Sequence, residues 1–172
     1  MVSEGDRTGG VVELREPANL VSPRARLMWL LEGVVQMAVL LAGQVVWWLI
    51  DQDGPRTPHL VVAAVWLVLA VAYLLVMPQW RYRVHRWENT ETAVYTQTGW
   101  LSQERRIAPV SRIQTVDLAR GPVAQLLGLA SVTVTTASAA GPLKIHGLDL
   151  AAARHLVNDL TERTIAEPGD AT

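Results

Sequence analysis

Two apolar runs decide the fold of this chain: LMWLLEGVVQMAVLLAGQVVWWLI at residues 27–50 and LVVAAVWLVLAVAYLLVM at residues 60–77. A run of about 18 or more residues with few charges is long enough to cross the hydrocarbon core of a bilayer as a helix. Because only residues 51–59 join the two runs, they predict a transmembrane helical hairpin. The segment before the hairpin and the domain after it are then expected on the same side of the membrane.

Basic residues at the ends of the hairpin predict its orientation. The first run follows a polar segment and ends without a small-residue cleavage site, which favours a retained helix over a cleaved signal peptide. Arginines precede the first run and follow the second, as Arg81, Arg83 and Arg86, whereas the connecting loop contains Arg56 alone. Both termini are therefore expected on the cytoplasmic side of the membrane. The three arginines after the hairpin either only orient it or also attract anionic lipid, by about 1 kcal/mol each.

The composition excludes several classes of site. The chain has 50% hydrophobic residues, a formal net charge of −1 and no cysteine, so disulfides and thiolate metal sites are excluded. Lys and Arg nearly balance Asp and Glu after the hairpin, which does not indicate a nucleic-acid partner. The histidines have no metal-ligand spacing, and no Gly-rich phosphate loop or nucleophile elbow is present. We therefore expect no cofactor, no metal and no enzymatic activity.

Two polar side chains interrupt the first apolar run. Glu32 and Gln36 are four residues apart, so they share one face of the predicted helix. Polar residues inside a membrane are costly and usually paired, so this face is a candidate surface for docking a partner helix, or for lining an ion path in a larger assembly. The simpler alternative is that Glu32 reaches the interface or pairs with an arginine such as Arg81.

After the hairpin the pattern changes to short alternating segments, which are typical of β-strands. Strands are expected at residues 81–87, 92–98, 103–108, 112–120, 131–136 and 143–146. The chain then ends in a segment with the apolar stripe of an amphipathic helix, at Ala152, Ala153, Leu156, Val157 and Leu160. These elements predict an α+β domain over residues 78–167, built as a small β-barrel or a pair of sheets that the helix closes.

The two ends of the chain are expected to be less ordered. Residues 1–26 form the predicted cytoplasmic N-terminal tail, and its mixed charges and Gly9-Gly10 predict disorder to about Pro23. Residues 168–172 are expected to be a frayed tail.

Three stretches of the domain resemble the bacterial membrane-flanked domain family, which is also described as the bacterial pleckstrin-homology-like domain. They are IAPVSRIQTVDL at residues 107–118, Gly121-Pro122, and LGLASVTVTT at residues 127–136. The resemblance covers residues 24–163 and includes the hairpin, as in single-copy members of the family. It implies a pleckstrin-homology-like split β-barrel with a C-terminal capping helix. It also implies a membrane partner, a larger protein with several copies of the same domain; a homo-oligomer is left open.

The resemblance also bears on possible sites. Pleckstrin-homology domains that bind phosphoinositides use a basic loop between the first two strands, but residues 88–91 read ENTE, which argues against that ligand. Arg112 and Gln114 belong to the family's most recognisable tripeptide, and they either recognise a partner or bond to backbone groups at a sheet corner. Arg106 belongs either to a small basic patch with Arg112 or to a surface ion pair with Glu104.

The sequence therefore predicts a non-catalytic, membrane-anchored assembly or accessory subunit of a bacterial plasma-membrane complex. In this hypothesis the face with Glu32 and Gln36 packs against another membrane helix, and the domain pairs with a like domain. The alternative hypothesis is a lipid- or peptide-handling component of an export or membrane-stress system. A pocket in the domain, or lipid held near Arg81 and Arg86, would favour this alternative.

Overall fold

The computed structural model describes residues 16–100, 102–138 and 141–166. Most of the predicted N-terminal tail, residues 1–15, and the predicted frayed end at 168–172 lie outside these described residues.

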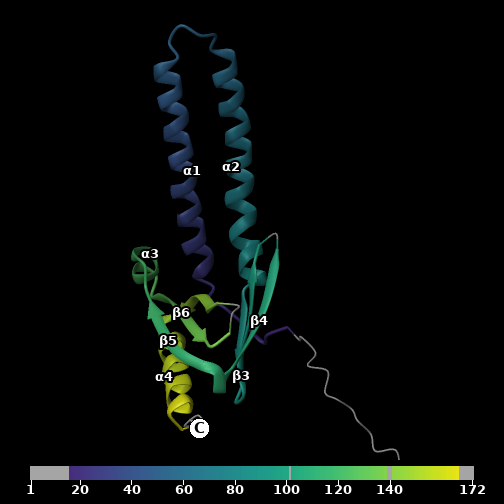
Figure 1. Ribbon diagram of the computed structural model, residues 1–172. Coiled ribbons are helices and arrows are strands. Elements are labelled where there is room, and N and C mark those ends of the chain that lie inside the picture. The colour runs from purple at the N-terminus through teal and green to yellow at the C-terminus, as the bar shows by residue number, and fades with distance from the viewer. Residues whose placement is uncertain (1–15, 101, 139–140, 167–172) are drawn as a thin grey trace, which may run out of the picture.

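Two long helices form a hairpin that stands on a β-rich domain (Figure 1): α1 (Ala25–Ile50) and α2 (Thr57–Val84). Both helices are long and apolar enough to cross a membrane. Their 26 and 28 residues extend over about 39 and 42 Å at 1.5 Å per residue. Since the hydrocarbon core is about 30 Å thick, the ends of both helices reach beyond it.

Helix α2 continues past the end of its apolar run. The sequence predicted its end at Met77 and a strand from Arg81, but the helix passes through Pro78 and ends at Val84. The prediction of a strand is therefore wrong as far as Val84. Proline removes one backbone N–H from a helix, and packing on both sides allows the helix to continue. Met77 and Pro78 are both buried where the hairpin meets the domain.

The domain contains two antiparallel sheets. The first has the order β1-β2-β3-β4, formed by Asn19–Leu20, Arg86–Asn89, Ala93–Gly99 and Gln103–Pro109. The second has the order β5-β6-β7, formed by Ile113–Ala119, Leu129–Thr136 and Leu143–Asp149. Two short helices connect strands, η1 (Val110–Arg112) between the sheets and α3 (Pro122–Leu126) between β5 and β6. The described strands of the two sheets do not pair with each other, so the sheets do not close into a barrel.

The C-terminal helix α4 (Leu150–Ala166) packs on the second sheet. Its apolar stripe buries Leu156 and Leu160, as the helical periodicity predicts. On the sheet, Val132 and Val134 are two residues apart on β6, point to the same face and are fully buried in the same core.

The first turns of α1 also belong to the core of the domain. Ala25 and Trp29, one helical turn apart, are 0% and 1% exposed. Gly147 on β7 has a φ of +76°, and a Cβ at this position would lie 2.6 Å from the Cβ of Ala25. Only glycine combines this backbone conformation with so close an approach. The hairpin is therefore packed into the domain rather than joined to it by a linker.

The described residues before α1, from Glu16 on, are structured, which corrects the prediction of disorder for the part of the tail up to Pro23 that the structure describes. Strand β1 pairs with β2. The backbone N–H of Ser22 donates to the carbonyl oxygen of Gly147 at 2.9 Å, and the Ser22 hydroxyl donates to the carboxylate of Asp149 at 2.9 Å. A polar tail sequence did not reveal these contacts because their partners lie at the other end of the chain.

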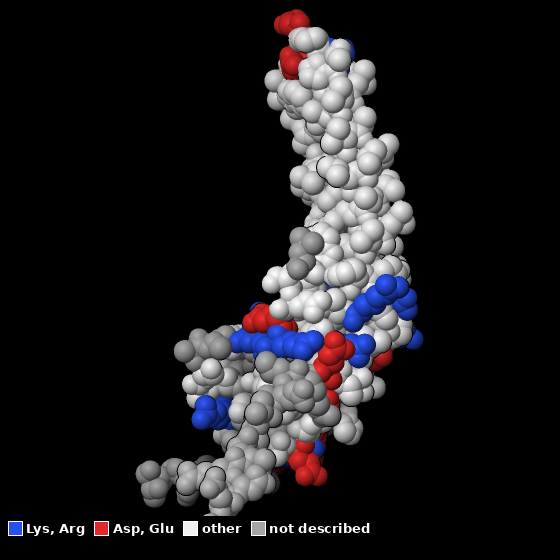
Figure 2. Space-filling view, turned by 90° about the vertical axis from the view of Figure 1, so that its right-hand side faces the viewer, with Lys and Arg blue, Asp and Glu red and all other residues white. Residues whose placement is uncertain are grey.

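The surface of the hairpin carries almost no charge between its tip and its base, and Lys and Arg gather, together with Asp and Glu, where it meets the domain (Figure 2). Val35, Val39 and Val68 are each more than 60% exposed in the isolated chain. Such a surface is expected of helices that contact lipid tails.

Candidate functional site

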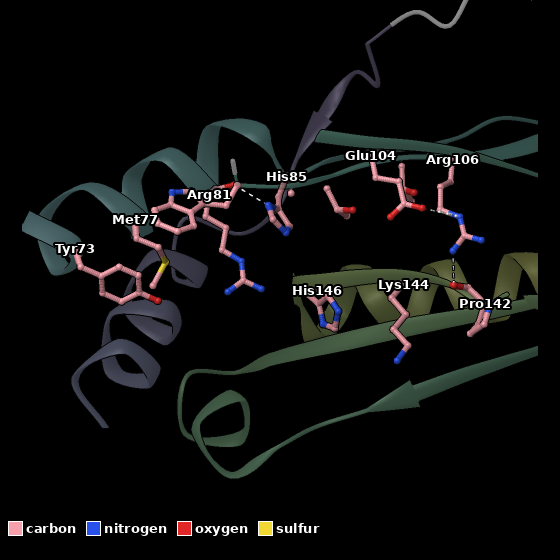
Figure 3. A pocket seen from close by; sticks show the side chains of 13 residues that line it. Tyr73, Met77, Arg81, His85, Glu104, Arg106, Pro142, Lys144 and His146 are labelled. Carbon is pink, nitrogen blue, oxygen red and sulfur yellow. Dashed lines mark hydrogen bonds and ion pairs between the residues drawn. The ribbon is translucent and has the colours of Figure 1, made fainter. Parts of the chain in front are cut away.

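A cavity of about 440 Å³ lies where α2 meets both sheets. This volume is within the range of small-molecule sites. Its lining comes from α2, β3, the β3–β4 turn, β4 and the region of β7: Tyr73, Met77, Arg81, His85, Thr96, Thr98, Gly99, Trp100, Glu104, Arg106, Pro142, Lys144 and His146. Figure 3 shows Arg81, His85 and His146 near the hairpin, and Lys144 with Arg106 further into the domain.

The periodicity of each element places its own lining side chains on one face, which points into the cavity. The α2 residues recur at intervals of four from Tyr73 to His85, so they form a single stripe of the helix. Lys144 and His146 are two residues apart on β7 and therefore share one face of the sheet. The cavity depends on the continuation of α2 beyond Pro78, because that continuation carries Arg81 to the domain.

Arg106, one of the cationic side chains in the cavity, is held by hydrogen bonds and an ion pair. Arg106 donates to the carbonyl oxygens of Pro142 and Gly141, at 2.7 and 3.0 Å. Its guanidinium also lies 3.5 Å from the carboxylate of Glu104. The ion pair that the sequence offered as an alternative to a basic patch is thus present.

The other two cations, Arg81 and Lys144, have no ion pair within 4 Å among the described residues. The guanidinium of Arg81 lies over the ring of Trp29, 4.8 Å from its centroid. Lys144 is exposed and is the single lysine of the chain. Because Glu104 offsets Arg106, these two side chains leave the cavity with an excess of positive charge.

Two histidines in the cavity stay neutral near pH 7. His85 is 3% exposed, and burial lowers its pKa to about 4. Its Nδ1 lies 2.8 Å from the carbonyl oxygen of Arg81; since a carbonyl only accepts, Nδ1 carries the proton and Nε2 is an acceptor. Burial also lowers the pKa of His146, and the charges of Arg81 and Lys144 lower it further. His146 Nδ1 lies 3.2 Å from the hydroxyl of Ser131.

Trp100, directly after β3, contacts α2 beside the cavity. The indole N–H of Trp80 donates to the carbonyl oxygen of Trp100 at 2.9 Å. The ring of Trp100 meets Tyr73 edge to face, with centroids 5.7 Å apart. A second, apolar groove of about 750 Å³ runs along the hairpin and reaches these two rings.

The structure places Glu32 and Gln36 near the base of the hairpin. Glu32 and Arg81 line a smaller cavity of about 280 Å³ beside α3, and Glu32 is close enough to attract Arg81 electrostatically. The amide oxygen of Gln36 accepts a hydrogen bond from the Tyr73 hydroxyl at 3.2 Å, within the hairpin itself. Docking of a partner helix by this face stays a prediction.

The other predicted residues lie apart from the cavity. Arg83 is exposed and Arg86 begins β2. Of the three arginines predicted to follow the hairpin, only Arg81 therefore lines the cavity. Arg112 and Gln114 are exposed at η1 and β5, and neither side chain has a hydrogen bond among the described residues. Their role in recognising a partner stays a prediction.

The loop between β2 and β3, which corresponds to the phosphoinositide-binding loop of the pleckstrin-homology domains that this domain resembles, faces α4. Asn89 donates to the carboxylate of Asp159 at 2.6 Å, and Arg163 donates to the carbonyl oxygen of Thr90 at 2.8 Å. In Figure 1 this end of β3 points away from the hairpin. The cavity that contains Arg81 and Lys144, which adjoins the hairpin, therefore lies at the end of the domain opposite to this loop.

Sequence reasoning missed His85, His146 and Lys144. The spacing of four between Arg81 and His85 was a usable signal, but it was assigned to a strand. Lys144 and His146 alternate with apolar residues of β7, which indicated only their shared face. The sequence around Lys144 and His146 contains no pattern that indicates contact of this face with α2.

Comparison with known proteins identifies the family. The family described as "Bacterial PH domain" matches residues 27–164, which include both helices. The chain is similar to the UPF0699 transmembrane protein YdbS of Bacillus subtilis (strain 168), with 30% identity over 125 residues that cover 72% of this chain and 79% of that protein. No solved structure matches it significantly. The family match confirms the predicted pleckstrin-homology-like fold class, and it shows that this membrane-associated chain belongs to the bacterial PH domain family.

Proposed function

We propose that this chain is a membrane-anchored, non-catalytic protein that binds a phosphate-bearing anion at the base of its hairpin. The observation that carries the proposal is the presence of Arg81 and Lys144 in one cavity, just beyond the apolar run of α2. With both termini in the cytoplasm, as the flanking arginines indicate, this cavity lies at the cytoplasmic surface of a bacterial plasma membrane. The proposal favours the lipid-handling hypothesis over the assembly hypothesis.

A phosphate fits the donors that the cavity offers. Arg81 and Lys144 come from α2 and β7 and line the same cavity, so both attract an anion that enters it. Guanidinium and ammonium groups both bind phosphate oxygens, and a hydrogen bond to a charged group contributes about 1.5–3 kcal/mol. Because His85 and His146 are neutral near pH 7, the positive charge that attracts the anion comes from Arg81 and Lys144.

The chemistry around Ser131 and His146 supports a non-catalytic role. Their contact at 3.2 Å, in the smaller cavity beside α3 that both residues line, is the arrangement nearest to a nucleophile with its base. A general base must become an imidazolium during the reaction, but Arg81 and Lys144 disfavour that charge on His146. No carboxylate contacts His146 among the described residues to offset them.

The single lysine provides a direct test in the full-length protein. The chain is reconstituted in nanodiscs of phosphatidylcholine, whose head group does not react with amine reagents, with or without phosphatidylglycerol, and treated with an amine-reactive reagent. Mass spectrometry then compares the labelling rate of Lys144 with that of the N-terminal amine, an internal reference. We expect the anionic lipid to slow Lys144 labelling at least threefold. An equal rate in both nanodiscs would overturn the proposal.

A matched pair of variants separates the cavity from general surface charge. Arg81→Gln and Arg83→Gln remove the same charge from the same helix end, but only Arg81 lines the cavity. Protection of Lys144 should be lost in Arg81→Gln and kept in Arg83→Gln. Equal protection in the two variants would mean that the membrane surface, and not the cavity, holds the anion.

One observation favours the assembly role as a second candidate function. β5 is an edge strand of its sheet, and the side chains of Arg112 and Gln114 are exposed beside that edge. An unpaired edge can accept a strand of a partner domain. The test is native mass spectrometry of the protein purified from its own membranes in mild detergent. A stoichiometric protein companion that is lost in Glu32→Leu supports this role, and a companion that survives the substitution contradicts docking through Glu32.

A further inference from the structure

We propose that the cavity and the apolar groove of the hairpin bind one anionic phospholipid, with its head group in the cavity and an acyl chain in the groove. This inference rests on the proposed function, and it names the ligand class: an anionic phospholipid of the membrane whose head group carries a hydroxyl.

The groove is suited to an acyl chain by its lining and its length. Its volume is about 750 Å³, and its walls are apolar or aromatic side chains of both helices, among them Leu40 on α1 and Leu69 on α2. Between the lining residues Val61 and Val76, α2 rises by about 22 Å. One leaflet contributes about half of the 30 Å hydrocarbon core, so the groove accommodates a chain over the full depth of a leaflet.

The groove and the cavity adjoin at two shared side chains. Tyr73 and Trp100 line both spaces. Their rings meet edge to face, and the hydrogen bond from Trp80 holds the carbonyl of Trp100 against α2. Tyr73 and Trp100 therefore form the boundary between the two spaces, and the proposed lipid passes from the groove to the cavity at this boundary.

The polarity along the cavity follows the order of groups in a phospholipid. In Figure 3, Tyr73 and Met77 lie at the hairpin end, Arg81 and His85 follow, and Lys144 lies beyond them. From Tyr73 to Arg81, α2 rises by about 12 Å. An acyl chain in the groove thus directs its phosphate toward Arg81 and its head group toward Lys144. A free phosphate would leave the apolar end of this path unused.

His85 adds selection among anionic lipids. Its Nδ1–H donates to the carbonyl of Arg81, so the lone pair of Nε2 remains, and no described residue donates to it. A lone pair repels a phosphate oxygen but accepts a hydrogen bond from a hydroxyl. A hydroxylated head group such as that of phosphatidylglycerol provides a phosphate for Arg81 and a hydroxyl for His85. Phosphatidylmethanol, an anionic phosphodiester without a hydroxyl, provides only the first.

The test is native mass spectrometry of the full-length protein in mild detergent with added phosphatidylglycerol. Ala72→Trp places a large ring in the groove, whereas Ala64→Trp makes the same change at an exposed site of α2 outside the groove lining. We expect one retained phosphatidylglycerol in the wild type and in Ala64→Trp, and at least fivefold less retention in Ala72→Trp. Equal retention in the two variants would overturn the placement of the chain in the groove.

A soluble probe keeps this inference distinct from the proposed function. Glycerol 3-phosphate carries the polar groups without the chains, and its protection of Lys144 should be unchanged by Ala72→Trp. If glycerol 3-phosphate protects Lys144 at concentrations as low as those of dispersed phosphatidylglycerol, the site binds a soluble anion and the lipid inference fails while the proposed function stands. If neither ligand responds to Arg81→Gln, the proposed function fails as well.

The head-group selection has its own control. Wild-type protein should retain phosphatidylglycerol at least threefold better than phosphatidylmethanol. His85→Asn preserves a donor for the carbonyl of Arg81 but is too short to reach the position of Nε2, so the two lipids should then be retained equally. Equal retention by the wild type would contradict a role of His85 in selection.

Discussion

Nδ1 of His85 lies 2.8 Å from the carbonyl oxygen of Arg81, one turn earlier on the same chain. The imidazole also packs against Trp29 of α1, with ring centroids 4.9 Å apart. The guanidinium of Arg81 in turn lies over the ring of Trp29, 4.8 Å from its centroid. Both helices of the hairpin are therefore joined to the cavity wall through one small cluster of three side chains.

The stability of the protein should fall at mildly acidic pH because of His85. Burial lowers its pKa to about 4, from about 6.5 in the unfolded chain. Between these values the unfolded chain binds more protons than the folded one, so the free energy of unfolding decreases as the pH falls from 6.5 toward 4. We expect a loss of about 2 kcal/mol, measured by thermal unfolding in detergent across this range.

The variant His85→Asn is the control for that pH dependence. It does not titrate, so its stability should change less between pH 6.5 and 4 than that of the wild type. His146, whose pKa is also lowered, remains in both proteins. Identical pH profiles would show that His85 does not carry the effect.

Gly147 should be intolerant of a side chain because β7 contacts α1 there. In Gly147→Ala, the left-handed backbone costs about 1–2 kcal/mol, and the new Cβ would stand 2.6 Å from that of Ala25. Gly141→Ala has the same backbone cost at φ +77° but no atom within 4 Å of the new Cβ. Unfolding in denaturant should show a loss larger by about 1–3 kcal/mol at Gly147. Equal losses would mean that the strand moves away without cost.

Gly33 should be required for packing within the hairpin. A Cβ at this position would lie 3.0 Å from Leu74 and 3.3 Å from Tyr73, whereas a Cβ at Gly43 would have no neighbour within 4 Å. Gly33→Leu is expected to destabilise the helix pair by about 1–3 kcal/mol, and Gly43→Leu to leave it unchanged. Titration with a denaturing detergent, followed by tryptophan fluorescence, measures the difference. A similar midpoint for both variants would contradict close packing at Gly33.

Substitution of Trp29 should affect both the stability of the protein and the binding of the anion in the cavity. It is 1% exposed, so Trp29→Ala is expected to cost about 3–5 kcal/mol in the free energy of unfolding. Trp29→Phe keeps most of the packing and a ring beneath Arg81, so we expect a smaller loss of stability and retained protection of Lys144. Protection that survives in a folded Trp29→Ala would show that Arg81 does not need this support.

The sequence was most informative where one physical rule applies along the chain. Bilayer thickness makes the hairpin readable from length and hydropathy alone, and alternation identified most strands of both sheets. The end of α2 was misjudged because Pro78 and the arginines after it are signals for leaving a helix in water. At the junction, packing of Met77 and Trp29 overrides those signals.

The cavity was beyond prediction because its parts come from distant elements. Arg81 was selected for its place beside the membrane, while His85 and Lys144 carried no pattern that distinguishes a lining residue from a surface residue. Their approach depends on how two sheets and a helix meet, which no local period encodes. The pairing of Gln36 with Tyr73 was missed for the same reason.

The contacts of Ser22 also limit how early the domain can fold during synthesis. Their partner Asp149 is 127 residues later in the chain, which corresponds to roughly 6–25 s of synthesis at about 5–20 residues per second. Both helices leave the ribosome well before β7 exists, so the hairpin enters the membrane with Ala25 and Trp29 uncovered. The domain can close around these residues only after β7 has been made, and a chain that stops before Gly147 leaves their apolar surface exposed beside the membrane.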